Sequence, residues 1–280
     1  MNRYVRKVRW IVGKHLWPVR RNRLRYLVRR MTHRWHLIHR AESPFIGPVT
    51  VWQLGRERRL VFGDNVRATT QSAVFTSGDW AELRREYWGR ALRWPTQLPA
   101  RPRVLLLGLG GGTIVRLVYE ASKPELFTAV ELDPVVAGVA QEYMGLGRLP
   151  HLDIRIGDVR QLVHTLCEEA PYDFVVEDVF FDGRAIDDVD EYAAALARLV
   201  APGGWLVLNR WFEDWGGNTI DSGQDATCAA LAARFEVVER VRVTQRWLNE
   251  LIFAGRPHRS DGGETVTDVG TERAPSHRRR

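Results

Sequence analysis

The order of apolar and polar residues from Arg103 onward predicts strands that alternate with helices. Continuous apolar runs, typical of buried parallel strands, are followed by segments whose apolar residues recur at helical spacing. The predicted strands are 103–107, 127–131, 152–156, 173–177 and 204–209, and the predicted helices are 112–121, 134–143, 158–168 and 188–200. This alternation predicts an α/β fold, in which a parallel sheet is covered by helices on both faces.

The C-terminal part of the chain continues with β-type patterning and then loses it. Three short apolar runs, 235–238, 240–243 and 250–253, predict further strands that close the edge of the sheet. Residues 256–280 have no apolar periodicity and end in three arginines, so we expect a disordered tail there.

Ahead of the α/β region, residues 43–78 have a different pattern. The β-rich runs 49–52, 59–62 and 66–69 are separated by turn residues, which predicts a small antiparallel meander. A helix is predicted from Asp79 to Trp94, where Pro95 ends it. The predicted organisation is therefore an arm, 1–42, a β-domain, 43–78, a cofactor-binding domain, 79–255, and a tail.

The arm combines helical apolar spacing with a strong positive charge. Residues 1–40 contain two Lys and eleven Arg and no Asp or Glu, a charge of +13, so the rest of the chain carries −6. Basic amphipathic helices, here separated at Trp17-Pro18, suit an anionic membrane surface or nucleic-acid phosphate. The alternative is that their apolar faces pack on the body or on a sister subunit. The absence of Ser from residues 1–40 argues against a mitochondrial transit peptide.

Composition narrows the class further. With 280 residues, 45% of them apolar, the chain can bury a substantial core. It has no apolar run long enough to cross a bilayer and no signal-peptide pattern. The two cysteines, Cys167 and Cys228, have neither metal-ligand spacing nor a disulfide pattern. These features predict a cytoplasmic protein without a metal.

A glycine-rich turn follows the first predicted strand of the α/β region. The run Val104–Thr113 reads Val-Leu-Leu-Leu-Gly-Leu-Gly-Gly-Gly-Thr, and glycines in this position let backbone approach a ligand that a Cβ would block. Glu131, Asp158 and Asp178 stand at the ends of the next three strands. Because ligands of such sheets bind at the carboxyl ends of the strands, this pattern predicts a nucleotide-type cofactor.

The individual carboxylates suggest separate roles. Glu131 follows Gly108 by 23 residues, near the spacing of about 20 expected for a ribose-binding carboxylate, and it can accept hydrogen bonds from both ribose hydroxyls. Asp158 is placed either to accept from the exocyclic amine of an adenine or to cap the following helix, and the two roles are compatible.

These motifs together resemble spermidine synthase and its relatives over about residues 43–255. The resemblance rests on the meander, on the turn read as Gly-x-Gly-x-Gly, on Glu131-Leu-Asp133, on Gly157-Asp158 and on the run 172–178. It implies a Rossmann-like methyltransferase fold with a small N-terminal antiparallel β-domain, and it is compatible with a homodimer. It also implies a sulfonium cofactor, S-adenosylmethionine or its decarboxylated form. The implied cofactor-binding residues are Gly108, Gly110, Gly111, Gly112, Glu131 and Asp158.

By the same resemblance, Asp178 is the catalytic carboxylate that takes up the proton of an attacking amine. A protonated amine has no lone pair, so a nearby base is chemically reasonable. Gln71 and Asp182 are the candidate residues for binding the small-molecule acceptor.

The chain departs from the family at three points. The family's turn carries an Asp that holds the propylamine of the decarboxylated cofactor, and Gly111 stands in its place. The segment 70–77 has no charge, where the family has acids that bind the polyamine. The family's second acid aligns with Phe181, one residue before Asp182.

Three hypotheses follow from these departures. The first is a transferase that moves an aminopropyl or methyl group to an unidentified acceptor, expected to be an amine. The second is a true spermidine synthase of polyamine biosynthesis, with acids supplied by Asp182, Asp187 and Asp188. The third is a non-catalytic cofactor-binding protein tethered by its arm.

A tryptophan cluster follows the last central strand. Trp205, Trp211 and Trp215 either belong to the core at the sheet edge or line an acceptor pocket beside Asn209 and Arg210.

Overall fold

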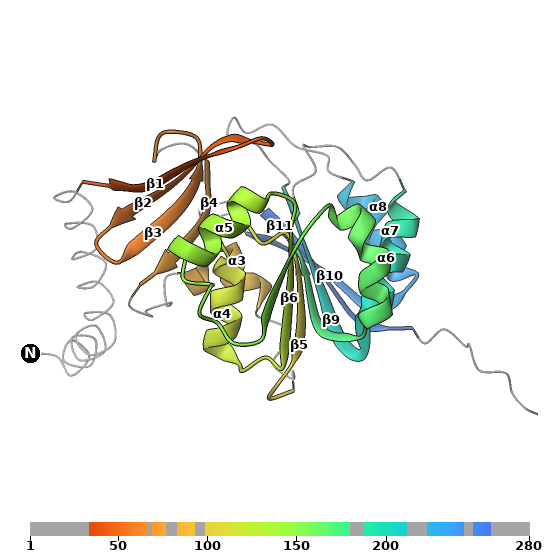
Figure 1. The fold of residues 1–280 in the computed structure, drawn as a ribbon. Helices are drawn as coiled ribbons and strands as arrows, with labels where there is room; N and C mark the ends of the chain where they lie inside the picture. Colours follow the sequence, from red (N-terminus) through yellow and green to blue (C-terminus); the bar gives the residue numbers. More distant parts are fainter. Residues whose placement is uncertain are drawn as a thin grey trace, which may run out of the picture.

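The computed structural model contains two β-sheets flanked by helices (Figure 1). It describes residues 34–66, 69–76, 83–92, 99–179, 188–211, 223–243 and 249–258. Most of the basic arm, residues 1–33, and most of the expected tail, residues 259–280, lie outside this described part.

The larger sheet has seven strands in the order β10-β11-β9-β8-β5-β6-β7. Its strands are β5 (Arg103–Leu107), β6 (Leu126–Glu131), β7 (Leu152–Ile156), β8 (Tyr172–Glu177), β9 (Val200–Trp211), β10 (Phe235–Val243) and β11 (Asn249–Pro257). All neighbouring pairs from β9 to β7 are parallel, and β11 pairs antiparallel with both β9 and β10. The predicted α/β fold is therefore confirmed, and the sheet is mostly parallel with an antiparallel pair at one edge.

The chain reverses its direction across this sheet at β5. It passes from β5 to β6 and β7 on one side, and then returns to β8 and β9 on the other. The carboxyl ends of β5 and β8 therefore meet at the point where ligands of open α/β sheets bind.

Helices cover both faces of the large sheet (Figure 1). They are α4 (Thr113–Ala121), α5 (Pro134–Tyr143), α6 (Val159–Glu169), α7 (Val189–Leu199) and α8 (Gln224–Ala232). Strand residues alternate between the two layers: Val104 and Leu106 pack with α4 and α5, whereas Leu105 and Leu107 pack with α6 and α7. Burial on both faces explains why the central strands are continuous apolar runs.

The smaller sheet is antiparallel, in the order β1-β2-β3-β4. Its strands are β1 (His36–Ser43), β2 (Gly47–Leu54), β3 (Glu57–Phe62) and β4 (Thr69–Phe75). The meander is present, but the prediction that the helical arm extends to residue 42 is wrong, because His36–Ser43 forms an edge strand. Pairing with β2 outweighs the helical spacing that ends at Ile38.

The continuous helix predicted for residues 79–94 is also wrong within its described part. A 3₁₀ turn, η2 (Leu83–Arg85), is followed by a short helix, α3 (Tyr87–Ala91). Glu86 between them is extended, with a ψ of 174°. The chain folds back so that a Cβ on Gly89 would lie 2.2 Å from the Cα of Arg84, which only glycine permits.

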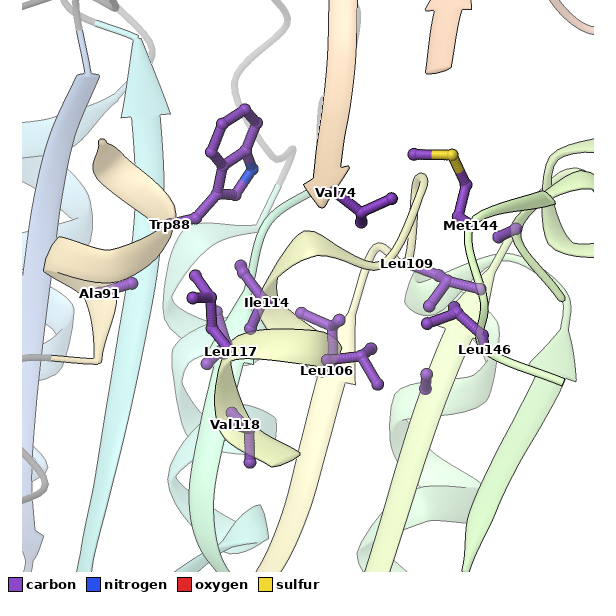
Figure 2. Packing of buried hydrophobic residues seen from close by; sticks show 14 of the residues in the cluster. Val74, Trp88, Ala91, Leu106, Leu109, Ile114, Leu117, Val118, Met144 and Leu146 are labelled. Atoms are coloured by element: carbon purple, nitrogen blue, oxygen red, sulfur yellow. The ribbon is translucent and has the colours of Figure 1, made fainter. Parts of the chain in front are cut away.

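The two sheets are joined through a shared core. Figure 2 shows Trp88 and Ala91 of α3 beside Ile114, Leu117 and Val118 of α4, with Val74 of β4 above the α4 residues. Met144 and Leu146, which follow α5, belong to the same cluster (Figure 2). The small sheet is thus packed against the helices nearest to the glycine turn.

Polar contacts fix β4 on the glycine turn itself. The Thr113 hydroxyl donates to the carbonyl of Ala73 at 2.9 Å and accepts from the Ala73 N–H at 3.1 Å. On the other side of the turn, the Ser43 hydroxyl donates to the buried Asp133 carboxylate. These bonds hold the small sheet in a fixed position above the carboxyl ends of β5 and β6.

Other expectations concern the strand edges and the thiols. The runs 235–238 and 240–243 form one strand, β10, rather than two, and β11 lies between β10 and β9. Cys167 and Cys228 are free and half-buried, and burial raises the pKa of each thiol. Within the described ranges, no helix has the length and apolarity needed to cross a bilayer, and no three His, Cys, Asp or Glu residues form a group that could hold a metal.

Candidate functional site

The glycine turn at the end of β5 has the backbone geometry that requires glycine. Gly108, Gly110 and Gly112 have φ values of +92°, +51° and +73°. A Cβ on Gly108 would lie 2.4 Å from the carbonyl oxygen of Asp178, and one on Gly112 would lie 2.4 Å from Leu146 Cδ1. The turn therefore brings the ends of β5 and β8 into direct contact, and no larger residue fits.

Glu131 ends β6 beside this turn. One carboxylate oxygen accepts from the Gly110 N–H at 2.8 Å, and the other accepts from the Asp133 N–H at 3.1 Å. Burial raises the pKa of Glu131, and the two N–H groups act in the opposite direction. The carboxylate is thus held in place, and each oxygen keeps a lone pair for a further donor.

Two exposed apolar side chains stand beside Glu131. Leu132, which follows the buried strand β6, is 46% exposed, and Ile156, at the end of the edge strand β7, is 48% exposed. Glu131 and Ile156 are register partners in β6 and β7, so the two apolar side chains flank the same edge of the sheet. Exposed apolar surface of this kind is suited to a flat, apolar ring.

Asp158 caps α6. Its side chain accepts from the Arg160 N–H at 2.9 Å and is also bound by the Arg160 guanidinium. The hydrogen bond from Arg160 is the main cause that lowers the pKa of Asp158. Of the two roles suggested by the sequence, the cap is the one present, and adenine binding stays a prediction.

Gly111 is buried beneath β4. Its N–H donates to the Ser72 hydroxyl at 2.8 Å, and a Cβ built on it would lie 2.5 Å from Ser72 Cβ and 3.2 Å from Leu60 Cβ. The space that an acidic side chain would need at this position is therefore filled by two neutral residues of the small sheet.

Asp178 follows β8 and receives two side-chain donors. Asn209 Nδ2 of β9 donates to one carboxylate oxygen at 2.7 Å, and the Tyr87 hydroxyl of α3 donates to the other at 3.3 Å. Burial raises the pKa of Asp178, and the two donors act in the opposite direction. A half-buried carboxylate with a raised pKa is a reasonable proton acceptor at neutral pH.

A buried polar network supports this carboxylate. Asn249 Nδ2 of β11 donates to Asn209 Oδ1 at 2.8 Å. The adjacent Arg210 donates to the Glu177 carboxylate and, at 2.8 Å, to the carbonyl of Asn209. Both members of this ion pair are buried, so their charges are balanced within the protein.

The remaining candidate residues are placed as follows. Gln71 lies at a bulge of β4, since Ser72 pairs with Leu60 while Thr70 pairs with Val61. Asp188 caps α7 by accepting from the Glu191 N–H at 2.8 Å. Asp182, Asp187 and Trp215 lie outside the described residues. Trp205 is partly buried against the core, as the first interpretation of the tryptophan cluster predicts.

These residues fit an S-adenosyl cofactor. The turn at Gly108 and Gly110 offers backbone without a Cβ, Glu131 offers a fixed carboxylate, and Leu132 and Ile156 offer apolar surface. One edge of the sheet thus offers protein backbone beside the amino-acid part of the cofactor, acceptors for its ribose and an apolar contact for its adenine.

Comparison with solved structures identifies proteins of the same fold. A spermidine synthase from Thermotoga maritima aligns with a TM-score of 0.51 and 16% identity, covering 79% of this chain and 72% of that one. A spermidine synthase in complex with the transition-state analogue AdoDATO aligns with a TM-score of 0.53 and 15% identity, covering 79% and 73%. The chain has a spermidine synthase-like, class I transferase fold.

Curated relatives of this chain are transferases of two kinds. The polyamine aminopropyltransferase of Vibrio vulnificus is 29% identical over 115 residues, which is 40% of this chain and 38% of the relative. The eEF1A lysine and N-terminal methyltransferase of Bos taurus is 27% identical over 174 residues, which is 58% and 24%. The chain thus spans well under half the length of these relatives, and no family model matches it.

Sequence reasoning missed three residues of this candidate site. Tyr87 lies within the predicted helix 79–94 and Ser72 within the uncharged segment 70–77, and the sequence pattern gives neither residue a role of its own. Asn249 precedes the apolar run 250–253, and a polar residue at the start of an otherwise buried strand is the signal that could have identified it.

Proposed function

We propose that the protein transfers a methyl group from S-adenosylmethionine to an amine. The observation that carries this proposal is the packing of Ser72 against Gly111, which leaves no room for an acidic side chain at the glycine turn. The other features of the site serve either donor equally well.

The donor preference follows from charge. Decarboxylated S-adenosylmethionine presents a cationic propylamine, for which a nearby carboxylate is the natural partner. At Gly111 the neighbours are Ser72 and Leu60, which carry no charge. The amino end of α4 lies directly after the turn and has no side-chain cap, so its N–H groups favour a negative group. A donor that keeps its carboxylate matches this environment better.

The acceptor preference follows from Asp178. This carboxylate accepts from Asn209 and Tyr87 and keeps lone pairs to bind an ammonium group and take its proton. Burial raises the pKa of Tyr87, which therefore stays a donor to Asp178 at neutral pH. The names of both kinds of relative specify amines as acceptors, either polyamines or lysine and N-terminal groups.

The protein's own contribution is position and proton transfer. When bound, S-adenosylmethionine supplies the electrophilic methyl carbon, so that an N–C bond forms, the S–C bond breaks and S-adenosylhomocysteine remains. Glu131 and the turn orient the donor, and Asp178 deprotonates and orients the amine. With a sulfonium leaving group, most of the remaining catalysis is orientation of the two reactants.

Calorimetric titration of the full chain tests the donor preference. We expect S-adenosylmethionine to bind at least about tenfold more tightly than its decarboxylated form, the effect of one favourable charge contact. Tighter binding of the decarboxylated form would contradict the proposal and favour aminopropyl transfer. If neither form binds, the protein has no such cofactor site.

Glu131→Gln should weaken cofactor binding without unfolding the protein. The amide offers one acceptor in place of two, and its NH₂ group would face an N–H of Gly110 or Asp133. We expect the Kd of S-adenosylhomocysteine to rise about tenfold to a hundredfold. Glu125→Gln, one residue before the same strand, is the matched control and should leave the Kd unchanged. An unchanged Kd in Glu131→Gln would remove this residue from the site.

A further inference from the structure

We propose that Asn249 is a positioning residue, which keeps the Asn209 amide turned so that its N–H faces Asp178. Asn249 Nδ2 donates to Asn209 Oδ1 at 2.8 Å, and Asn209 Nδ2 donates to Asp178 Oδ1 at 2.7 Å. A primary amide has its donor and its acceptor on opposite sides, so the partner of the oxygen decides which group faces the carboxylate. The inference rests on the proposed function, in which Asp178 takes the proton of an amine.

The place of Asn249 in the fold supports a role of this kind. It is 1% exposed and begins β11, where Leu251 and Phe253 on the same strand are buried apolar residues. A buried amide is costly unless it is hydrogen-bonded, and an apolar residue would satisfy the packing alone. Asn209 bonds to both Asn249 and Asp178, so Asn249 can act on the carboxylate through Asn209.

The orientation of Asn209 affects the proton on Asp178. An ionised carboxylate only accepts, and so needs the NH₂ group of Asn209. A protonated Asp178 would instead donate to the amide oxygen, which would have to turn away from Asn249. By holding that oxygen, Asn249 favours the ionised form, which is the form that can accept a proton.

Other groups near Asp178 also affect the pKa of its carboxylate, independently of Asn249. Tyr87 on α3 donates to its second oxygen. Arg210 on β9 lowers the pKa of Asp178, and its own charge is paired with that of Glu177 on β8. None of these groups depends on a hydrogen bond from Asn249, so the effect of Asn249 can be separated from theirs.

The test is Asn249→Leu in the full chain, with ¹³C NMR titration of the Asp178 carboxyl and a pH profile of kcat/KM. We expect the pKa of Asp178 to rise by about one pH unit, so that the rising limb of the kcat/KM profile moves to higher pH by the same amount and kcat/KM at a pH below this limb falls about tenfold. The Kd of S-adenosylhomocysteine should stay within about twofold, because a positioning role does not involve the donor. Leu251→Val, on the same strand, is the matched control and should shift neither quantity.

A second variant, Asn209→Leu, distinguishes a positioning role of Asn249 from a general loss of structure. In Asn209→Leu, the added Asn249→Leu change should produce no further rise in the pKa of Asp178, because the link between the two is gone. Asn249→Asp keeps the shape of the side chain, and its ionised form accepts only. Asn249→Asp should therefore rotate the Asn209 amide, so that its oxygen faces Asp178, and raise the pKa of Asp178. This variant provides the test if Asn249→Leu folds poorly.

The outcomes separate this inference from the proposed function. An unchanged pKa of Asp178 in both Asn249 variants would overturn it, as would an equal shift with and without Asn209. The titration needs no turnover. If no methyl transfer occurs with any amine, the proposed function fails, and the shift in pKa still decides the role of Asn249.

Discussion

Asp178→Asn is expected to reduce kcat/KM for transfer to an amine by about a hundredfold to ten-thousandfold, the usual contribution of a positioned general base. The asparagine cannot take a proton, and its NH₂ group would oppose the donor of Asn209 that now binds the carboxylate at 2.7 Å. Cofactor binding should persist, because the contacts of Glu131 with the glycine turn are not changed.

The pH dependence makes this prediction specific. In the wild type, kcat/KM should rise with pH through the raised pKa of Asp178, since the ionised form is the active one. In Asp178→Asn that rise should disappear. The difference in kcat/KM between Asp178→Asn and the wild type should become smaller at high pH, where the amine loses its proton to solvent.

The fold should tolerate this substitution. Burial raises the pKa of Asp178 above its ordinary value, so the native state holds a proton that the unfolded chain releases. The free energy of unfolding therefore falls as the pH rises through this window, and a neutral asparagine should keep or raise the Tm above it. Asp173→Asn on the same strand, where the carboxylate accepts from the Arg103 N–H, is the matched control and should keep normal activity. Normal activity in Asp178→Asn would exclude it as the base.

Gly111→Asp is expected to lower the free energy of unfolding by about 3 kcal/mol or more, because it combines overpacking with a buried carboxylate. A Cβ at this position already lies 2.5 Å from Ser72 Cβ, before the carboxyl group is added. Denaturant unfolding measures the loss. Gly111→Ala should lower the free energy of unfolding by about 1–3 kcal/mol, because it causes overpacking without adding a carboxylate.

Matched variants test whether the lack of space above Gly111 causes the loss of stability. Gly138 in α5 has no atom within 4 Å of its Cβ position apart from its neighbours in the helix backbone, so Gly138→Ala should stabilise the protein by about 0.5–1 kcal/mol. Ser72→Gly removes the closest atoms, and in that background Gly111→Asp should recover part of the stability. The double variant should also gain affinity for decarboxylated S-adenosylmethionine. If Gly111→Asp is as stable as the wild type, the small sheet does not limit this position.

The elements that follow from local pattern could be predicted from the sequence. The central strands are buried on both faces, and residues such as Val104 and Leu105 serve opposite layers, so their apolar runs are continuous and easily identified. The positions of Asp178 and Glu131 at the same edge of the sheet could be predicted because parallel strands place their carboxyl ends together, and their roles stay predictions.

Features that depend on pairing between distant segments could not be predicted in this way. Edge strand β1 is specified by β2, not by its own periodicity, which is helical up to Ile38. The contact of Ser72 with Gly111 joins segments 39 residues apart, and the contact of Asn249 with Asn209 joins segments 40 residues apart. A sequence pattern shows that these residues are polar or small, and only the packed sheets show which partner each one meets.

Identification of the by-product tests the central claim most directly. The full chain is incubated with S-adenosylmethionine or its decarboxylated form, together with diamines and a peptide that offers a lysine and a free N-terminus. Mass spectrometry then identifies the nucleoside that is released. Methyl transfer to an amine predicts S-adenosylhomocysteine and a methylated amine. Methylthioadenosine formed only from the decarboxylated donor would contradict this account and identify an aminopropyltransferase, and bound cofactor without either product would contradict it in favour of a non-catalytic role.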